Sequence, residues 1–155
     1  MIEIERKFLV NSDAFLRQAV NSYRISQGYL NTHPERTVRV RLKDHNGYIT
    51  IKGKSNAEGT TRNEWEYPIS GEEARELLQL CEPVLIEKVR YEIPYGDFVF
   101  EVDVFLGAHQ GLVIAEVELP DAELSFPKPM WLGEEVTGDI RYYNAHLSKT
   151  VYPFE

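Results

Sequence analysis

The feature that most constrains the fold of this chain is a strand pattern in which apolar and charged residues alternate. Successive side chains of a strand point to opposite faces, so such a segment has one apolar and one charged face. Uncharged polar residues are few between the charges, so these faces are expected to converge on something charged. The charged positions are Glu3, Glu5 and Lys7; Arg39, Arg41 and Lys43; Lys52 and Lys54; Glu64 and Glu66; Lys88 and Arg90; Glu101 and Asp103; Glu116 and Glu118.

This alternation predicts eight strands, at residues 2–10, 23–30, 36–44, 47–54, 62–69, 84–93, 97–105 and 112–119. Tight turns are expected at Asn46-Gly47 and at Tyr95-Gly96, because these residue types tolerate positive φ. Irregular chain is expected after Pro129. Helices are predicted at 13–20 after Ser12, from a capping box of Ser70 and Glu73, and from Thr137 or Asp139 to about Lys149.

Length and composition favour a single domain spanning residues 1–155. The net charge of −8 argues against a nucleic-acid partner, since phosphate backbones are bound by basic surfaces. The sequence has neither an apolar run long enough for a membrane span nor a signal peptide, which predicts a cytoplasmic protein. Cys81 is the only cysteine, so no intrachain disulfide can form, and we expect it to be buried.

The charged faces can point outward or inward. A β-sandwich with its charges in water is the usual antiparallel arrangement and stays open as an alternative. The apolar stripes of the helices, however, need a sheet face to cover, which would leave the charged side concave. The alternating positions comprise eight acids and eight bases, so an enclosed set would be nearly neutral, as buried charge requires. We therefore predict a mainly β (α+β) fold, an eight-stranded antiparallel closed barrel with a charged interior and flanking helices.

Such an interior suits a metal-chelated polyphosphate. Alternate carboxylates on a strand lie about 6.5 to 7 Å apart and can converge on one cation. Oxygen ligands favour Mg²⁺ or Mn²⁺ over zinc, and Lys and Arg donate to phosphate oxygens. The histidines lack ligand spacing and are expected to face solvent or cap local structure: His33, His45, His109 and His146.

The opening EIERKF resembles the signature of the CYTH superfamily, the triphosphate tunnel metalloenzymes. Further segments carry the resemblance along nearly the whole chain: SQGYL, VRVRL, TIKGK, EWEY, EKVRY, FEVDVF, AEVEL and GEEVTGDIRYYN. The resemblance implies an eight-stranded tunnel, open at both ends, that holds a triphosphate with a divalent metal.

The resemblance also implies roles for individual residues. Glu3, Glu5 and Glu118 would ligate the metal. Phosphate oxygens would be held by Lys7, Arg39, Arg41, Lys52, Lys88, Arg90 and Arg141. Catalytic roles, such as holding a second metal, orienting water or contacting the terminal phosphate, would belong to Glu64, Glu66, Glu101, Asp103, Glu116 and Tyr29.

The chain looks most like the small bacterial members that hydrolyse inorganic tripolyphosphate to pyrophosphate and phosphate. Three alternatives stay open: a class IV adenylate cyclase, a thiamine triphosphatase, and a noncatalytic polyphosphate-binding module. The expected partner is a small-molecule triphosphate, and both a monomer and a homodimer are compatible with the sequence.

Overall fold

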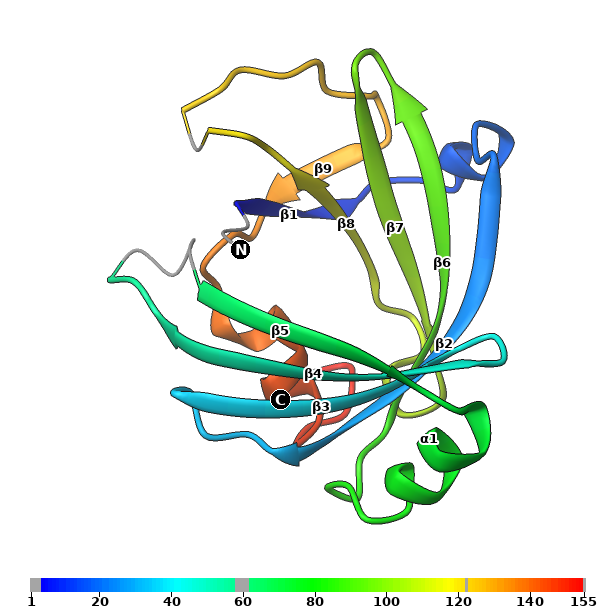
Figure 1. Ribbon diagram of the computed structural model, residues 1–155. Coiled ribbons are helices and arrows are strands. Elements are labelled where there is room, and N and C mark those ends of the chain that lie inside the picture. Colours follow the sequence, from blue (N-terminus) through cyan, green and yellow to red (C-terminus); the bar gives the residue numbers. More distant parts are fainter. Residues whose placement is uncertain (1–3, 58–61, 122, 155) are drawn as a thin grey trace.

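The computed structural model describes residues 4–57, 62–121 and 123–154, and it is mainly antiparallel β-sheet. Its described strands form one nine-stranded sheet in the order β5-β4-β3-β2-β6-β7-β8-β1-β9 (Figure 1). Their bounds are β1 Glu5–Val10, β2 Asn21–Asn31, β3 Arg36–Lys43, β4 Asn46–Ser55, β5 Arg62–Ile69, β6 Ile86–Tyr95, β7 Phe98–Leu106, β8 Val113–Glu118 and β9 Leu132–Glu135. The helices are short: η1 Ala14–Arg17, α1 Gly71–Leu78, η2 Gly107–His109, η3 Ile140–Tyr142 and α2 Asn144–Leu147.

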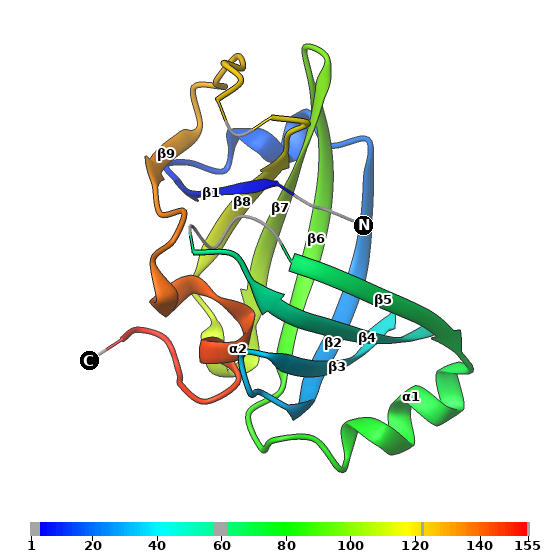
Figure 2. The same ribbon diagram turned by 60° about the vertical axis from the view of Figure 1, so that its left-hand side comes forward.

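The sheet curls strongly, so that β3, β4 and β5 face β1 and β8 across its concave side (Figures 1 and 2). The predicted closed barrel of eight strands is wrong, because β5 and β9 are unpaired edges among the described strands. The free side of β1 pairs with β9, through Phe8 with Glu135 and Val10 with Leu132. At Gly133 a Cβ atom would lie 2.9 Å from the Leu9 carbonyl oxygen, so glycine permits this approach. Strand β9, in a segment predicted to be irregular, thus occupies the edge of β1 that would have to pair with β5 to close a barrel.

The apolar face of the sheet is convex and is covered from outside. Phe15 of η1 and two residues of the segment before β9, Phe126 and Trp131, pack with Phe8 and Phe100 of the sheet. On the other half of the sheet, α1 packs against β3, β4 and the end of β5. The predicted placement of helices outside the sheet, with the charged face concave, is confirmed for η1 and α1, and the sandwich alternative is wrong. The predicted C-terminal helix is instead two short helices, η3 and α2, whose residues pack on the concave side.

Helix α1 begins with a capping box and packs closely against the start of β4. The capping box is confirmed, since the Glu73 N–H donates to Ser70 Oγ at 3.0 Å and the Glu73 carboxylate accepts from the Ser70 N–H. A Cβ atom at Gly47 would lie 2.8 Å from that of Ala74, so glycine is needed there for helix packing. Lys43 pairs with Asn46, so the β3–β4 turn falls at Asp44-His45, where Asp44 has φ of 53°, and the predicted Asn46-Gly47 turn is wrong.

The second predicted turn lies one residue away from its expected position. Tyr95 pairs with Phe98, so the turning residues are Gly96 and Asp97, and Gly96 has the positive φ, 62°, that such a turn uses. Cys81, expected to be buried, is partly buried beside α1, and its Sγ lies 3.4 Å from the Leu77 carbonyl oxygen.

One end of the concave side is filled by apolar side chains. Ile114 and Phe105 follow the same strand alternation as the charged residues, and they pack with Tyr142 and Leu147 of the C-terminal segment. His109 is buried, and its Nε2 lies 2.7 Å from the Leu147 carbonyl oxygen and 2.8 Å from that of Thr150, so it caps the last turn of α2. The resemblance implies a tunnel open at both ends, whereas here apolar side chains fill this end. None of the described helices has the length and apolar character to cross a membrane.

Candidate functional site

The concave side of the sheet holds a cavity of about 310 Å³. Six acidic and six basic side chains line it, together with Tyr29 of β2 and part of the C-terminal segment. Charge of both signs therefore dominates a space large enough for a small ligand. The charged residues are Glu5, Glu64, Glu66, Glu101, Glu116 and Glu118, and Lys7, Arg39, Arg41, Lys52, Arg62 and Arg90.

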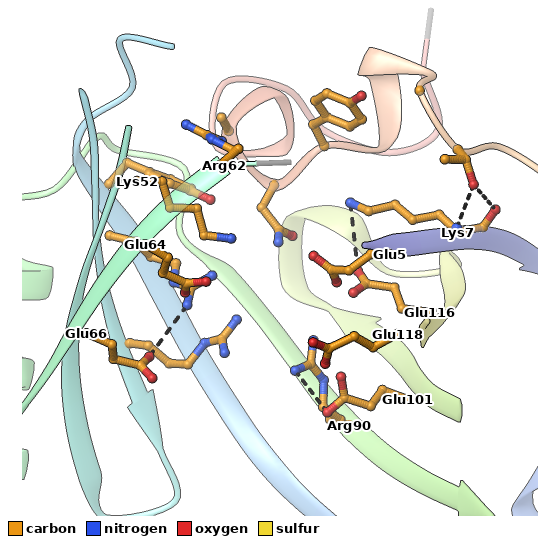
Figure 3. Close-up of a pocket in the computed structure, with 18 residues that line it drawn as sticks. Glu5, Lys7, Lys52, Arg62, Glu64, Glu66, Arg90, Glu101, Glu116 and Glu118 are labelled. Carbon is orange, nitrogen blue, oxygen red and sulfur yellow. Dashed lines mark hydrogen bonds and ion pairs between the residues drawn. The ribbon is translucent and has the colours of Figure 1, made fainter. Parts of the chain in front are cut away.

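The two signs are unevenly distributed over the cavity (Figure 3). We call the side formed by β1, β7 and β8 the acidic wall, which carries Glu5, Glu101, Glu116 and Glu118. We call the side formed by β3, β4 and β5 the basic wall, which carries Arg39, Arg41, Lys52 and Arg62. Each wall also holds charges of the other sign, Lys7 on the acidic wall and Glu64 and Glu66 on the basic wall.

The guanidinium groups of the basic wall lie mainly against neutral partners. Arg41 Nε donates to Gln27 Oε1 at 2.8 Å, and Arg39 Nη2 donates to Thr50 Oγ1 at 3.2 Å. A carboxylate oxygen of Glu66 is 3.9 Å from Arg39 Nη2, and Arg39 Nε is buried without a hydrogen-bond partner among the described residues. Burial, with repulsion from Arg39 and Arg90, lowers the pKa of Arg41 to about 9. This wall therefore concentrates positive charge that an anion would stabilise.

Arg90 is held in the floor of the cavity by a buried ion cluster. Its Nε and Nη2 donate to the two carboxylate oxygens of Asp103 at 2.7 and 2.9 Å, and its Nη1 lies 3.5 Å from Glu101. Lys88 Nζ forms a buried ion pair with Asp103, 2.7 Å from its Oδ2. Burial lowers the pKa of Lys88 to about 8 despite Asp103. Lys88 and Asp103 lie behind the cavity lining, where they support Arg90.

The acidic wall contains a carboxyl pair that competes for one proton. Repulsion by Glu116 and burial raise the pKa of Glu5 well above its usual range. Burial also acts against ionised Glu116, but Lys7, whose Nζ is 3.7 Å from Glu116 Oε1, and a hydrogen bond with Glu5 lower the pKa of Glu116. At neutral pH the pair therefore carries one negative charge and one shared proton.

The donors of the acidic wall suit a hard divalent cation. The possible ligand atoms of its acidic side chains are all carboxylate oxygens. The proton shared by Glu5 and Glu116 reduces the repulsion between the two carboxylates, and a cation bound there would do the same. Within the part of the chain that the structure describes, no three acidic, His or Cys side chains already form a metal cluster. Glu3, which the resemblance assigns to the metal, lies outside the described residues. The residues present fit a metal bound together with its ligand.

The structure places most predicted site residues on this cavity, but not all of them. Arg141 is exposed, donates to Asp139 Oδ2 at 2.7 Å and does not line the cavity. Sequence reasoning missed Arg62, although it follows the same two-residue period as Glu64 and Glu66. It also missed lining residues of the C-terminal segment, for which no strand pattern gave a signal: Thr137, Gly138, Tyr143, Asn144 and Ala145.

The fold and the site define the class of protein as a curled antiparallel sheet whose concave side forms one charged cavity between an acidic and a basic wall. The family model for the CYTH domain matches residues 1–150, and the chain belongs to the CYTH domain family.

Relatives and solved structures agree with this assignment. An inorganic triphosphatase of Acetivibrio thermocellus is 48% identical over 97% of this chain and 95% of its own length. One of Nitrosomonas europaea is 37% identical over 97% of this chain and 99% of its own. A crystal structure of an inorganic triphosphatase superposes with a TM-score of 0.72 at 32% identity, covering 96% of this chain and 98% of the other.

Proposed function

We propose that this protein is an inorganic triphosphatase that hydrolyses tripolyphosphate to pyrophosphate and phosphate with a divalent metal. The observation that carries the proposal is the pairing of an acidic wall with a basic wall across one cavity, because a metal-complexed phosphate chain carries both complementary charges. The two relatives of 48% and 37% identity, both named inorganic triphosphatase and matched over nearly their full length, support it.

In this proposal the basic wall binds the phosphate chain. Arg39, Arg41 and Lys52 donate to its oxygens, with Arg62 beside them and with Lys7 and Arg90 across the cavity. Arg62 is oriented for this by donating to the Gly53 carbonyl oxygen at 2.9 Å and to Thr37 Oγ1 at 3.0 Å. These cations neutralise the charge of the transferred phosphoryl group.

The acidic wall would hold the metal through Glu5 and Glu118, which face each other across the β1–β8 pair, with Glu3 as a further ligand from the sequence. Mg²⁺ and Mn²⁺ are the cations that such oxygen ligands favour. When bound, the metal would supply positive charge that neutralises phosphate oxygens.

Hydrolysis needs a water in line with the bond that breaks. The water oxygen attacks the terminal phosphorus, the bond from phosphorus to the bridging oxygen breaks, and pyrophosphate leaves. We assign the orientation of this water to the carboxylates Glu64, Glu66, Glu101 and Glu116, while Tyr29 contacts the terminal phosphate. No covalent nucleophile takes part. The roles of Lys88, Asp103 and Arg141 toward substrate stay predictions, as do action in the cytoplasm and a monomeric or homodimeric state.

A substrate panel tests the proposal. Purified protein is given tripolyphosphate, ATP or thiamine triphosphate with Mg²⁺ or Mn²⁺, and phosphate is resolved from cyclic AMP. We expect tripolyphosphate to have the highest kcat/KM. Cyclic AMP as the main product from ATP would establish a cyclase, preference for thiamine triphosphate would establish that hydrolase, and tight binding without turnover would establish a binding module.

A further inference from the structure

A chain of hydrogen bonds runs from the outer face of β1 to the rim of the cavity. Arg6 donates to both carboxylate oxygens of Glu135, at 2.8 Å from Nε and 2.6 Å from Nη2. The Thr137 hydroxyl donates to Glu135 Oε2 at 2.7 Å and accepts from the Lys7 backbone N–H at 2.8 Å. Of these four residues, Lys7 and Thr137 line the cavity, whereas Arg6 and Glu135 lie behind it.

The C-terminal segment that contains Thr137 contacts both the backbone and the side-chain ammonium group of Lys7. The Val136 N–H donates to the Lys7 carbonyl oxygen at 2.8 Å, which places Thr137 beside the Lys7 backbone. At the other end, Lys7 Nζ lies 3.4 Å from the Tyr142 carbonyl oxygen and 5.2 Å from the centre of the Tyr143 ring. The ammonium group also points toward Glu116 in the cavity (Figure 3).

Lys7 benefits from such support because a lysine side chain is a flexible stem with a point charge at its end. A shift of the β1 backbone at Lys7 would move the ammonium group relative to any phosphate in the cavity. The hydroxyl of Thr137 is the one side-chain atom of the segment that hydrogen-bonds the Lys7 backbone in the described structure. Its own orientation is set by the carboxylate of Glu135, whose pKa is lowered by its hydrogen bonds with Arg6 and Thr137.

We propose that Thr137 is a positioning residue for Lys7, and that the Arg6–Glu135 pair holds the Thr137 hydroxyl in its working orientation. This inference rests on the proposed function, since it assigns Lys7 to phosphate binding. The Arg6–Glu135 pair is partly exposed, with side chains that are 24% and 35% accessible, and solvent screening limits what such a pair contributes to global stability. Its effect is therefore expected in ligand affinity.

The test compares Thr137→Val, which keeps the shape but removes the hydroxyl, with Thr137→Ser, which restores it. Thr150→Val is the matched control, because Thr150 lies in the same C-terminal segment and its hydroxyl donates to the His146 carbonyl oxygen instead of to Lys7. For hydrolysis of tripolyphosphate we expect Thr137→Val to raise KM about three- to tenfold with a smaller change in kcat. Thr137→Ser and Thr150→Val should retain the wild-type KM.

A binding measurement separates this inference from the proposed function. The Kd of tripolyphosphate without metal is measured by calorimetry for each variant, which needs no turnover, and Thr137→Val should raise it by the same factor as KM. If the wild type binds but does not hydrolyse tripolyphosphate, the proposed function is wrong while the Kd values still test Thr137. An unchanged Kd in Thr137→Val, or an equal increase in Thr150→Val, overturns the inference.

Coupling between the residues sharpens the result. If Arg6 and Glu135 act through Thr137, then Arg6→Met should raise Kd in the wild type and add little in a Thr137→Val background. Fully additive effects of Arg6→Met and Thr137→Val on Kd would contradict the idea that Arg6 and Glu135 act through Thr137. The melting temperature of every variant is measured without ligand. If the loss of affinity parallels the drop in melting temperature across all variants, the positioning role is also overturned.

Discussion

The two walls of the cavity differ in how their charges are balanced before any ligand binds. On the basic wall, Arg41 and Arg39 hydrogen-bond neutral Gln27 and Thr50, so their positive charge is only partly offset. On the acidic wall, Glu116 has Lys7 nearby and shares a proton with Glu5. One wall keeps its charge and the other reduces it by taking up a proton. The difference teaches that an anion can bind the basic wall as it stands, whereas a cation that binds Glu5 and Glu116 must displace their shared proton.

Removal of divalent metal tests the acidic wall and should have the largest effect on activity. We expect EDTA to lower tripolyphosphate hydrolysis roughly a thousandfold, because the metal supplies several kcal/mol of charge stabilisation. Activity is followed by phosphate release and should return with excess Mg²⁺ or Mn²⁺. Full turnover in EDTA would mean that the basic wall is sufficient and that the acidic wall has another purpose.

Removing one arginine of the basic wall should have the next largest effect. Arg39→Ala is expected to lower kcat/KM about 100-fold, because charge-assisted hydrogen bonds to phosphate are lost in a buried place. Arg36→Ala is the matched control, since Arg36 lies on the same strand, is exposed and does not line the cavity. Similar losses in both variants would show a general electrostatic effect of the strand instead of a specific contact.

The carboxyl pair predicts a pH dependence of stability in the metal-free protein. The pKa of Glu5 is raised from 4.5 to about 9, so between these values the folded state binds more protons and stability falls as pH rises. Lys88, with a pKa lowered to about 8, has the opposite effect, which appears above that pH. Melting temperatures should therefore decline across this window in the wild type and less in Glu5→Gln. Equal slopes in the two proteins would contradict proton sharing.

Arg141→Ala should have the smallest effect. Arg141 is exposed and paired with Asp139, and exposed ion pairs are weak, so we expect kcat/KM to change by less than about threefold. A loss comparable to that of Arg39→Ala would place Arg141 in the substrate site, as the sequence resemblance predicts, and would add a third region to the two walls.

Local patterns predicted much of the fold because they depend on neighbouring residues. The alternation in RNEWEYPI gave the bounds of β5, residues 62–69, as the structure has them, and Ser70 with Glu73 marked the start of α1. The turn before Gly47 was misplaced because the glycine serves a contact with Ala74, which is distant in sequence. Strand β9 was missed because four residues between turns carry little periodic signal, and its pairing partner in β1 lies more than 120 residues earlier.

The same distinction applies to the site. Arg62 follows the alternation of its strand and was within reach of the sequence argument, whereas Thr137 lines the cavity only because β9 brings the following residues beside Lys7. Lys88 and Asp103 have the right periodicity, yet they lie behind the cavity, since the curl of the sheet and the Arg90 side chain decide which inward groups reach the open space.

The sequence by itself determined which residues share a strand face, because alternation follows from backbone geometry and requires no knowledge of distant contacts. It thereby determined that acids and bases would gather on one side of an antiparallel sheet. Only the tertiary structure decided that the sheet stays open between β5 and β9, that apolar residues fill one end, and that acids and bases form opposing walls. Those features depend on the curl and pairing of strands far apart in the chain, and the energy of each charge depends on the neighbours that this packing provides.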